Sequence, residues 1–199
     1  LLPCGTTGES ATMTHEEHES AIRICIEQVK GRVPVLAGSG SNNTAEAIRL
    51  TAFAKKAGAD AALLISPYYN KPTQEGIFRH FKAVNDAVAL PLFVYNVPGR
   101  TGSNILPSTV ARMFRELEHV AGIKEATGNL VQVSNILEQC GQDFLLFSGD
   151  DFTLLPSLSL GARGVISVTS NIAPARVAAL CEAWEKGDAA LARRLHFEL

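Results

Sequence analysis

The chain has 199 residues, of which 46% are hydrophobic and 19% charged, and its formal net charge is -2. This is the composition of an ordinary globular protein rather than a disordered chain, and the lack of any basic run argues against a nucleic-acid partner. The apolar runs are too short to cross a membrane, and the first residues carry no basic leader, so we expect no membrane association.

Short apolar runs alternate with longer amphipathic stretches along the whole chain. The runs are apolar at nearly every position, as strands buried on both faces require. In chain order, the expected strands are residues 1–4, 33–37, 61–66, 91–95, 120–123, 144–148 and 164–168.

The amphipathic stretches carry the end signals of helices. Thr14 and Glu17 form a capping-box pattern, which Asn43 and Glu46 repeat at the next helix. Glycines fit the helix C-termini and prolines fit first helical turns, namely Gly58, Gly141, Gly161 and Gly187, and Pro107 and Pro174. Strand and helix therefore alternate without a linker, which predicts a parallel α/β fold in one domain over residues 1–199.

The notable polar residues follow the strands, whereas the helix-to-strand connections are plain. Loops with candidate chemistry follow six of the seven expected strands, and this favours a closed barrel, because an open sheet concentrates its site at one switch point. We therefore predict a (β/α)8 TIM barrel. Since such a barrel needs eight strands, we expect this chain to be incomplete, lacking the first strand and the C-terminal helices.

Lys124 is the sharpest candidate for chemistry. It ends the apolar run 120–123, so it should point toward the mouth of the barrel and be partly desolvated. Desolvation enlarges the neutral fraction of an amine, and a neutral amine is the nucleophile that attacks a carbonyl. The alternative is a structural salt bridge to a carboxylate such as Glu125.

Three further residues could assist such an amine. Tyr95 ends its own strand and could relay protons, although it could equally be a core aromatic with a solvated hydroxyl. Thr7 offers a second hydroxyl in the glycine-rich first loop, or is simply a turn residue. Arg100 follows Pro98-Gly99 and suits the capture of a carboxylate, or lies free on the surface.

No pattern in the sequence requires a metal or an organic cofactor. Histidines flank Glu16-Glu17, but their spacing is one residue short of the zincin motif. Asp150 and Asp151 lack neighbouring ligands, and a helix N-cap is the better interpretation. Cys4, Cys25, Cys140 and Cys181 fit no zinc motif or C-x-x-C pair, so we expect reduced thiols and a cytoplasmic protein.

Five motifs, in order, resemble those of the 4-hydroxy-tetrahydrodipicolinate synthase (dihydrodipicolinate synthase) family of the N-acetylneuraminate lyase superfamily. They are Gly5-Thr6-Thr7-Gly8-Glu9-Ser10, Pro67-Tyr68-Tyr69-Asn70, Tyr95-Asn96-Val97-Pro98-Gly99-Arg100-Thr101-Gly102, Gly122-Ile123-Lys124-Glu125-Ala126-Thr127-Gly128 and Ser148-Gly149-Asp150-Asp151. The resemblance covers nearly the whole chain.

The resemblance implies a lyase that condenses pyruvate with L-aspartate 4-semialdehyde on the diaminopimelate route to lysine, without metal or cofactor. It implies that Lys124 forms an imine with pyruvate and that Thr7, Tyr95 and Tyr69 relay protons, with Tyr69 supplied by the neighbouring subunit. Arg100 would bind the semialdehyde carboxylate. Thr6, Thr7 and Ile166 would line the pyruvate pocket.

The resemblance further implies a homotetramer built from two tight dimers, and an allosteric site for free L-lysine. The residues expected at that site are Ser10, Ala11, His15, His18, Asn42, Glu46 and Tyr68. Glu46 offers a negative charge for a lysine amine, and helices that follow adjacent strands lie side by side. In the alternative interpretation, Glu46 only belongs to a capping box and the histidines are solvated.

Two other functions stay open at this point. One is another pyruvate-dependent aldolase of the superfamily, such as N-acetylneuraminate lyase or a keto-deoxy sugar acid aldolase; Thr7, the Tyr68-Tyr69 pair and above all Arg100 favour the synthase. The other is a catalytically inactive barrel that serves as a binding module, which the presence of every motif residue argues against.

Overall fold

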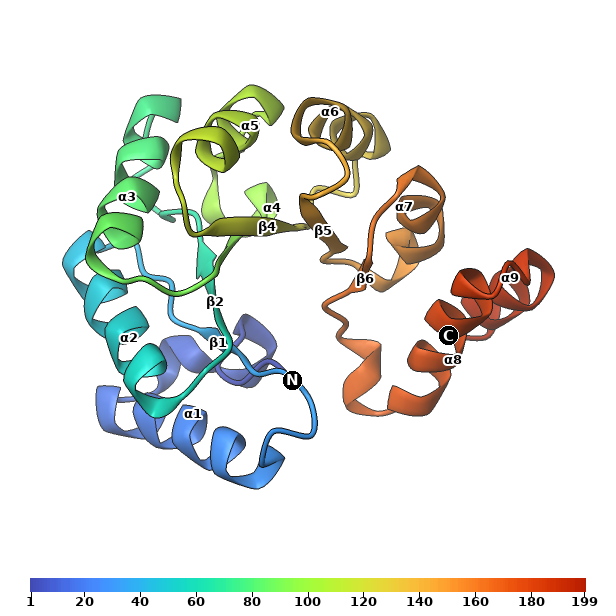
Figure 1. Ribbon diagram of the computed structural model, residues 1–199, viewed down its shortest axis with the longest axis horizontal. Helices are drawn as coiled ribbons and strands as arrows, with labels where there is room; N and C mark the ends of the chain where they lie inside the picture. Colours follow the sequence, from blue (N-terminus) through green and yellow to red (C-terminus); the bar gives the residue numbers. More distant parts are fainter.

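The computed structural model describes residues 1–199 and contains one parallel sheet with helices packed against it (Figure 1). The six strands are hydrogen-bonded in the order in which they occur in the chain, and every neighbouring pair is parallel. Their bounds are β1 Leu36–Gly38, β2 Ala61–Ile65, β3 Leu92–Asn96, β4 Val120–Glu125, β5 Leu145–Ser148 and β6 Gly164–Val165. The predicted parallel α/β fold is confirmed.

Helices follow one another around the outside of the sheet in Figure 1. They are α1 His15–Val29, α2 Thr44–Ala57, α3 Gln74–Ala87, α5 Pro107–Glu116, α6 Leu130–Cys140 and α7 Leu154–Leu160. The short helix α4 (Pro98–Thr101) lies in the loop after β3, and α8 (Pro174–Glu185) and α9 (Ala189–Glu198) follow β6. No helix combines the length and apolar character that a membrane crossing requires.

The helix ends at Thr14, Gly58, Pro107 and Pro174 follow the predicted signals. The capping box at Thr14 is complete, because the Thr14 side chain accepts from the Glu17 backbone and the Glu17 side chain accepts from the Thr14 backbone. Gly58 ends α2 in the left-handed conformation, which glycine adopts without strain because it has no Cβ atom. Pro107 and Pro174 each occupy a first turn, where the missing amide hydrogen costs no helical bond.

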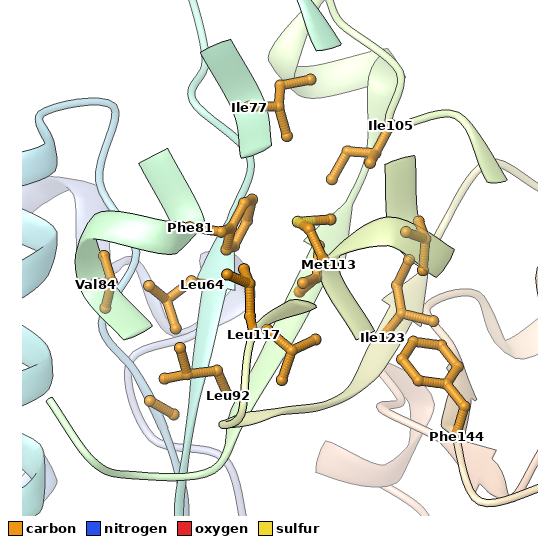
Figure 2. Packing of buried hydrophobic residues seen from close by; sticks show 14 of the residues in the cluster. Leu64, Ile77, Phe81, Val84, Leu92, Ile105, Met113, Leu117, Ile123 and Phe144 are labelled. Carbon is orange, nitrogen blue, oxygen red and sulfur yellow. The ribbon is translucent and has the colours of Figure 1, made fainter. Parts of the chain in front are cut away.

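The outer face of the sheet packs against the helices and forms the main hydrophobic core. This cluster has 22 buried residues, and Figure 2 shows Leu64, Leu92 and Ile123 of the strands against Phe81 of α3 and Met113 of α5. The side chains of these five residues are fully buried. This layer fixes the positions of the strands, and through them the positions of the loops at the carboxyl ends.

The inner face of the sheet carries a smaller and more open cluster, in which Leu63, Phe93 and Tyr95 are buried and Phe147 and Ile166 are partly buried. The register between β3 and β4 shifts by one residue, since Leu92 pairs with Val120 but Phe93 pairs with Gly122. Because side chains alternate between faces, this shift decides which residues of β4 face inward.

Three predictions about the strands are wrong: one expected strand does not form, and two have other bounds. Residues 1–4 were expected to form a strand, and they do lie beside β1, because the amides of Leu36 and Gly38 donate to the carbonyls of Leu1 and Pro3 at 2.9 and 3.0 Å. A parallel ladder would also need an amide hydrogen at residue 3, which proline lacks. The expected strands 33–37 and 164–168 are shortened to Leu36–Gly38 and Gly164–Val165.

Candidate active site

Lys124 lies near the carboxyl end of β4 and points to the inner face. Its Nζ atom is 4.2 Å from the centroid of the Tyr95 ring, and the two residues are register partners on adjacent strands. Burial lowers the pKa of Lys124 to about 8, although the negative charge of Asp150 opposes the shift. The amine is therefore neutral far more often near neutral pH than a solvated lysine is.

The structure excludes the predicted alternative of a salt bridge between Lys124 and Glu125. Glu125 is the next residue of the strand and therefore points to the opposite face of the sheet. Its carboxylate accepts hydrogen bonds from Asn96, Gln132 and the amide of Thr127. No carboxylate forms an ion pair with Lys124.

Tyr95 is buried beside the amine, and burial raises the pKa of its phenol. The hydroxyl therefore keeps its proton at neutral pH and can donate it. Gly149, in the loop after β5, passes close to the Lys124 side chain, because a Cβ atom at Gly149 would lie 3.2 Å from Cε of Lys124 and 2.4 Å from Cβ of Ala126. The glycine that follows Ser148 was the only sequence signal for this close approach.

A cavity of about 350 Å³ opens above Lys124 and Tyr95, and Thr6 and Arg100 also line it. Arg100 belongs to α4, which begins with Pro98 and is anchored by Thr101, whose hydroxyl donates to the carbonyls of Val97 and Ser103. The guanidinium forms no salt bridge within the chain. It is therefore free to bind a carboxylate that enters the cavity.

Three predicted residues lie away from the cavity lining. Thr7 is exposed in the 3-10 helix Thr6–Gly8, and Tyr69 is 91% exposed with a φ angle of 70°. Ile166 follows β6 and packs in the inner cluster. The structure therefore brings Lys124 and Tyr95 together, while the roles of these three residues remain predictions.

The same cavity extends to the residues expected for the effector. Ser10, Ala11, His15, His18, Glu46 and Tyr68 all line it. Asn42 lies beside it, and its Nδ2 atom donates to the carbonyl of Tyr68 at 3.1 Å.

Glu46 is held by hydrogen bonds rather than free in solvent. Its carboxylate accepts from the hydroxyl of Ser41 at 2.5 Å and lies 2.7 Å from Nε2 of His15. These two bonds, the one from Ser41 being the stronger cause, lower the pKa of Glu46. The Glu46 side chain does not return to the Asn43 amide, which donates instead to Ser41, so the capping-box alternative is wrong.

His18 is buried at the same end of the cavity, and its Nδ1 atom has no hydrogen-bond partner. Burial lowers the pKa of His18, and its ring is therefore neutral at neutral pH. The alternative in which both histidines are solvated is thus wrong for His18. Ser41 was missed from the sequence because a single serine in a loop carries no signal.

The acidic pair after β5 differs from its predicted role as a helix cap. Asp150 precedes the 3-10 helix Asp151–Thr153 without capping it by its side chain. Asp151 instead accepts hydrogen bonds from the amides of Val168 and Thr169 in the loop after β6. No group of three His, Cys, Asp or Glu side chains converges as a metal site requires.

A desolvated lysine beside a tyrosine, at the carboxyl ends of parallel strands, is typical of lyases that form a Schiff base. The comparisons agree with this class. The chain belongs to the dihydrodipicolinate synthetase family, whose sequence model matches residues 1–199.

Relatives and solved structures cover the whole chain. The 4-hydroxy-tetrahydrodipicolinate synthase of Nitratidesulfovibrio vulgaris (strain DP4) is 67% identical over 100% of this chain and 68% of its own length. Dihydrodipicolinate synthase from Aquifex aeolicus has a TM-score of 0.97 at 46% identity, over 100% of this chain and 68% of that chain.

Two further structures contain small molecules. The chloride-inhibited synthase from Acinetobacter baumannii is complexed with pyruvate; it is 45% identical with a TM-score of 0.95, over 98% of this chain and 67% of that one. The synthase from Cyanidioschyzon merolae has lysine bound; it is 42% identical with a TM-score of 0.95, over 98% of this chain and 66% of that one.

Proposed function

We propose that the protein is a Schiff-base lyase that condenses pyruvate with L-aspartate 4-semialdehyde to give 4-hydroxy-tetrahydrodipicolinate, in the biosynthesis of diaminopimelate and lysine. The observation that carries the proposal is the buried amine of Lys124 beside Tyr95 at the floor of the cavity. Relatives of that name, 56–67% identical over the full chain, support the substrate pair.

The chemistry follows from the amine. Neutral Lys124 attacks the carbonyl carbon of pyruvate, and the resulting carbinolamine loses water to become a protonated imine. The positive nitrogen withdraws electrons, so a proton leaves the pyruvate methyl group and an enamine forms. The enamine carbon then attacks the aldehyde of the second substrate. The amino group of that substrate next attacks the imine carbon and closes the ring, and Lys124 leaves as the free amine. Tyr95 donates and accepts protons in these steps, together with Thr7 and with Tyr69 of a neighbouring subunit.

Substrate recognition is divided between two groups of residues. Thr6, Thr7 and Ile166 hold pyruvate beside Lys124, and Arg100 binds the carboxylate of the semialdehyde. The unpaired guanidinium of Arg100 supports a second substrate that carries a carboxylate, because a charge without an internal partner is available to a charged ligand.

The opposite end of the cavity binds free L-lysine as an effector. Glu46 would accept from an amine of lysine, and Ser10, Ala11, His15, His18, Asn42 and Tyr68 would complete the site. Calorimetric titration of the intact protein with L-lysine should give binding that Glu46→Ala weakens. Inhibition that this variant leaves unchanged would place the effector elsewhere.

The six strands are consecutive members of a closed (β/α)8 barrel, in a protein that assembles as a tetramer in the cytoplasm. The strand order and the 0.97 TM-score to the Aquifex aeolicus structure support the barrel. The exposed ring of Tyr69 supports a shared site between subunits. All four cysteines are free thiols, in keeping with a reducing compartment.

Borohydride reduction in the presence of pyruvate tests the proposal. The intact protein should gain one pyruvate-derived mass on the peptide that contains Lys124, and Lys124→Met should gain none. Labelling at another lysine would overturn the mechanism. Trapping with pyruvate but no turnover with the semialdehyde would favour another aldolase of the superfamily.

A further inference from the structure

The outer layer of the sheet contains one buried carboxylate, that of Glu125, which is 3% exposed. Its neighbours on the outer face include Ile123 and Val94, which belong to the main hydrophobic core. A carboxylate is costly in such a place, and an apolar side chain would usually be the more stable choice. Burial raises the pKa of this carboxyl, although the hydrogen bonds that it accepts act in the opposite direction.

No cation compensates this charge, and neutral donors surround it instead. The Oε2 atom of Glu125 accepts from Nδ2 of Asn96 at 2.9 Å and from Nε2 of Gln132 at 3.1 Å, and Oε1 accepts from the amide of Thr127 at 2.8 Å. Three donors of this kind fix the direction of a carboxylate much more strictly than a single ion pair does.

Asn104 closes the group into a network. It accepts from Asn96 at 2.9 Å and donates to Oε1 of Gln132 at 2.8 Å, while Asn96 accepts from the amide of Ile105 at 3.0 Å. We call Asn96, Asn104, Glu125 and Gln132 the Glu125 network. It ties together the end of β3, the end of β4, the start of α6 and the segment that follows α4.

These are the same pieces of chain that carry the candidate active site. Tyr95 pairs with Lys124 on the inner face, and the next pair in register, Asn96 with Glu125, lies on the outer face. Arg100 is linked to the network through α4, because Thr101 bonds to the carbonyl of Ser103, the residue before Asn104. A small displacement of the network would therefore move all three site residues.

We propose that Glu125 is a positioning residue, which holds Lys124, Tyr95 and the Arg100 helix in the geometry that imine formation needs. The inference rests on the proposed function and adds a residue to it that does not touch the substrate. Reactions of this kind lose rate when the reacting groups shift by a fraction of an ångström. The hydrogen bonds of Glu125 hold the site residues precisely, and this explains why a charged side chain is kept in a buried position.

Glu125→Gln tests the proposal in the intact protein. The variant keeps the size of the side chain but turns one acceptor into a donor that faces other donors. We expect kcat to fall by at least tenfold, and we expect the pH midpoint of borohydride trapping with pyruvate to rise above that of the wild type, because a displaced Lys124 is less desolvated. Asp150, Asp151 and Arg100, the charged groups that act on Lys124, are unchanged.

Two further variants keep the test decisive. The double variant Glu125→Gln with Gln132→Glu exchanges the amide and the carboxylate, so kcat and the midpoint should return toward the wild type. Gln132→Leu removes one donor from Glu125 and should shift both quantities in the same direction but less. If Glu125→Gln does not fold, Gln132→Leu alone decides the matter.

Phe81→Leu is the control for lost stability, since Phe81 is buried in the outer core on α3. It should lower the melting temperature and leave the pH midpoint unchanged. If Glu125→Gln has the same pH midpoint and kcat as the wild type, the positioning role is overturned. If Glu125→Gln does not fold, the same result for Gln132→Leu overturns it. A wild type that pyruvate does not label would overturn the proposed function itself.

Discussion

The two faces of the sheet differ in packing and in polarity. The outer face presents Leu64, Leu92 and Ile123 to the helices, and these side chains are fully buried in a continuous apolar layer (Figure 2). The inner face has fewer buried residues and opens at the carboxyl ends of the strands into the cavity. The outer face therefore contributes most of the apolar packing that stabilises the fold, and the inner face carries the candidate catalytic residues.

Two consecutive residues show how sharply this division is drawn. Lys124 faces inward with no ion pair, in a place where burial destabilises its charge. Glu125 faces outward and is satisfied by three donors. An unsatisfied charged group on one face is tolerated because the other face holds the strand firmly, as is common where structure is used for reactivity.

Removal of the inner amine should have the largest effect on activity. Lys124→Met should lower kcat by more than about 10³-fold, as loss of a covalent nucleophile does. The folded-state pKa of about 8 lies below the ordinary lysine value of 10.5. Between these values the unfolded chain binds more protons, so the wild type should gain stability as the pH rises from about 8 to 10.5.

The variant lacks this group, so its melting temperature should not show that gain and should exceed that of the wild type at neutral pH. Melting curves across this pH window, together with turnover assays, check both expectations. A melting temperature that falls in Lys124→Met at neutral pH would show that the amine is not destabilising in the fold.

A substitution in the outer core should have the opposite effect, lowering stability but not kcat. Leu64→Ala removes a fully buried side chain from the outer core, and it should cost about 2–5 kcal/mol of unfolding free energy because a cavity remains. Denaturant titration measures that loss. The molecules that remain folded should keep the wild-type kcat, and a tenfold decrease would mean that the two faces are not separable.

Arg100→Ala should impair use of the semialdehyde and leave the reaction with pyruvate intact. The loss of a charge-assisted hydrogen bond costs about 1.5–3 kcal/mol, so kcat/KM for the semialdehyde should fall roughly 10- to 150-fold. Trapping of pyruvate on Lys124 should be nearly unaffected. Arg79→Ala is the matched control, because Arg79 is an exposed arginine of α3 that pairs with Glu75; equal effects of the two variants would contradict a specific role.

The smallest effect concerns the wild type itself. Imine formation needs the neutral amine, so its rate should rise about tenfold per pH unit below the Lys124 pKa of about 8 and level off above it. A shift of one pKa unit corresponds to a change of about 1.4 kcal/mol in the free-energy difference between the charged and neutral amine. Short-time borohydride trapping at several pH values measures the midpoint, and a midpoint near 10.5 would show a solvated lysine instead.

Much of the architecture follows from local patterns in the sequence. Apolar runs between turn signals predicted approximate positions for all six strands and one strand that does not form. Thr14, Gly58, Pro107 and Pro174 predicted ends of helices, because capping and proline geometry depend only on neighbouring residues. The position of Lys124 at the end of an apolar run likewise predicted a desolvated amine, and the five motifs predicted the family that the comparisons found.

Tertiary structure alone decided which way the key side chains point. Strict alternation from Val120, which lies in the outer core, would place Lys124 outside as well; the register shift at Gly122 turns Ile123 outward and Lys124 inward. Gly122 permits this, since a Cβ atom there would lie 2.1 Å from the carbonyl oxygen of Leu145.

The same holds for groups that meet across long stretches of chain. Asn96 and Gln132 surround Glu125, and Ser41 and His15 surround Glu46, by contacts that no local pattern encodes. Sequence periodicity specifies which face of an element is apolar, because burial is governed by the spacing of side chains along that element. Pairing between strands and docking of helices then determine which polar groups share that buried space, and with it the pKa of the amine.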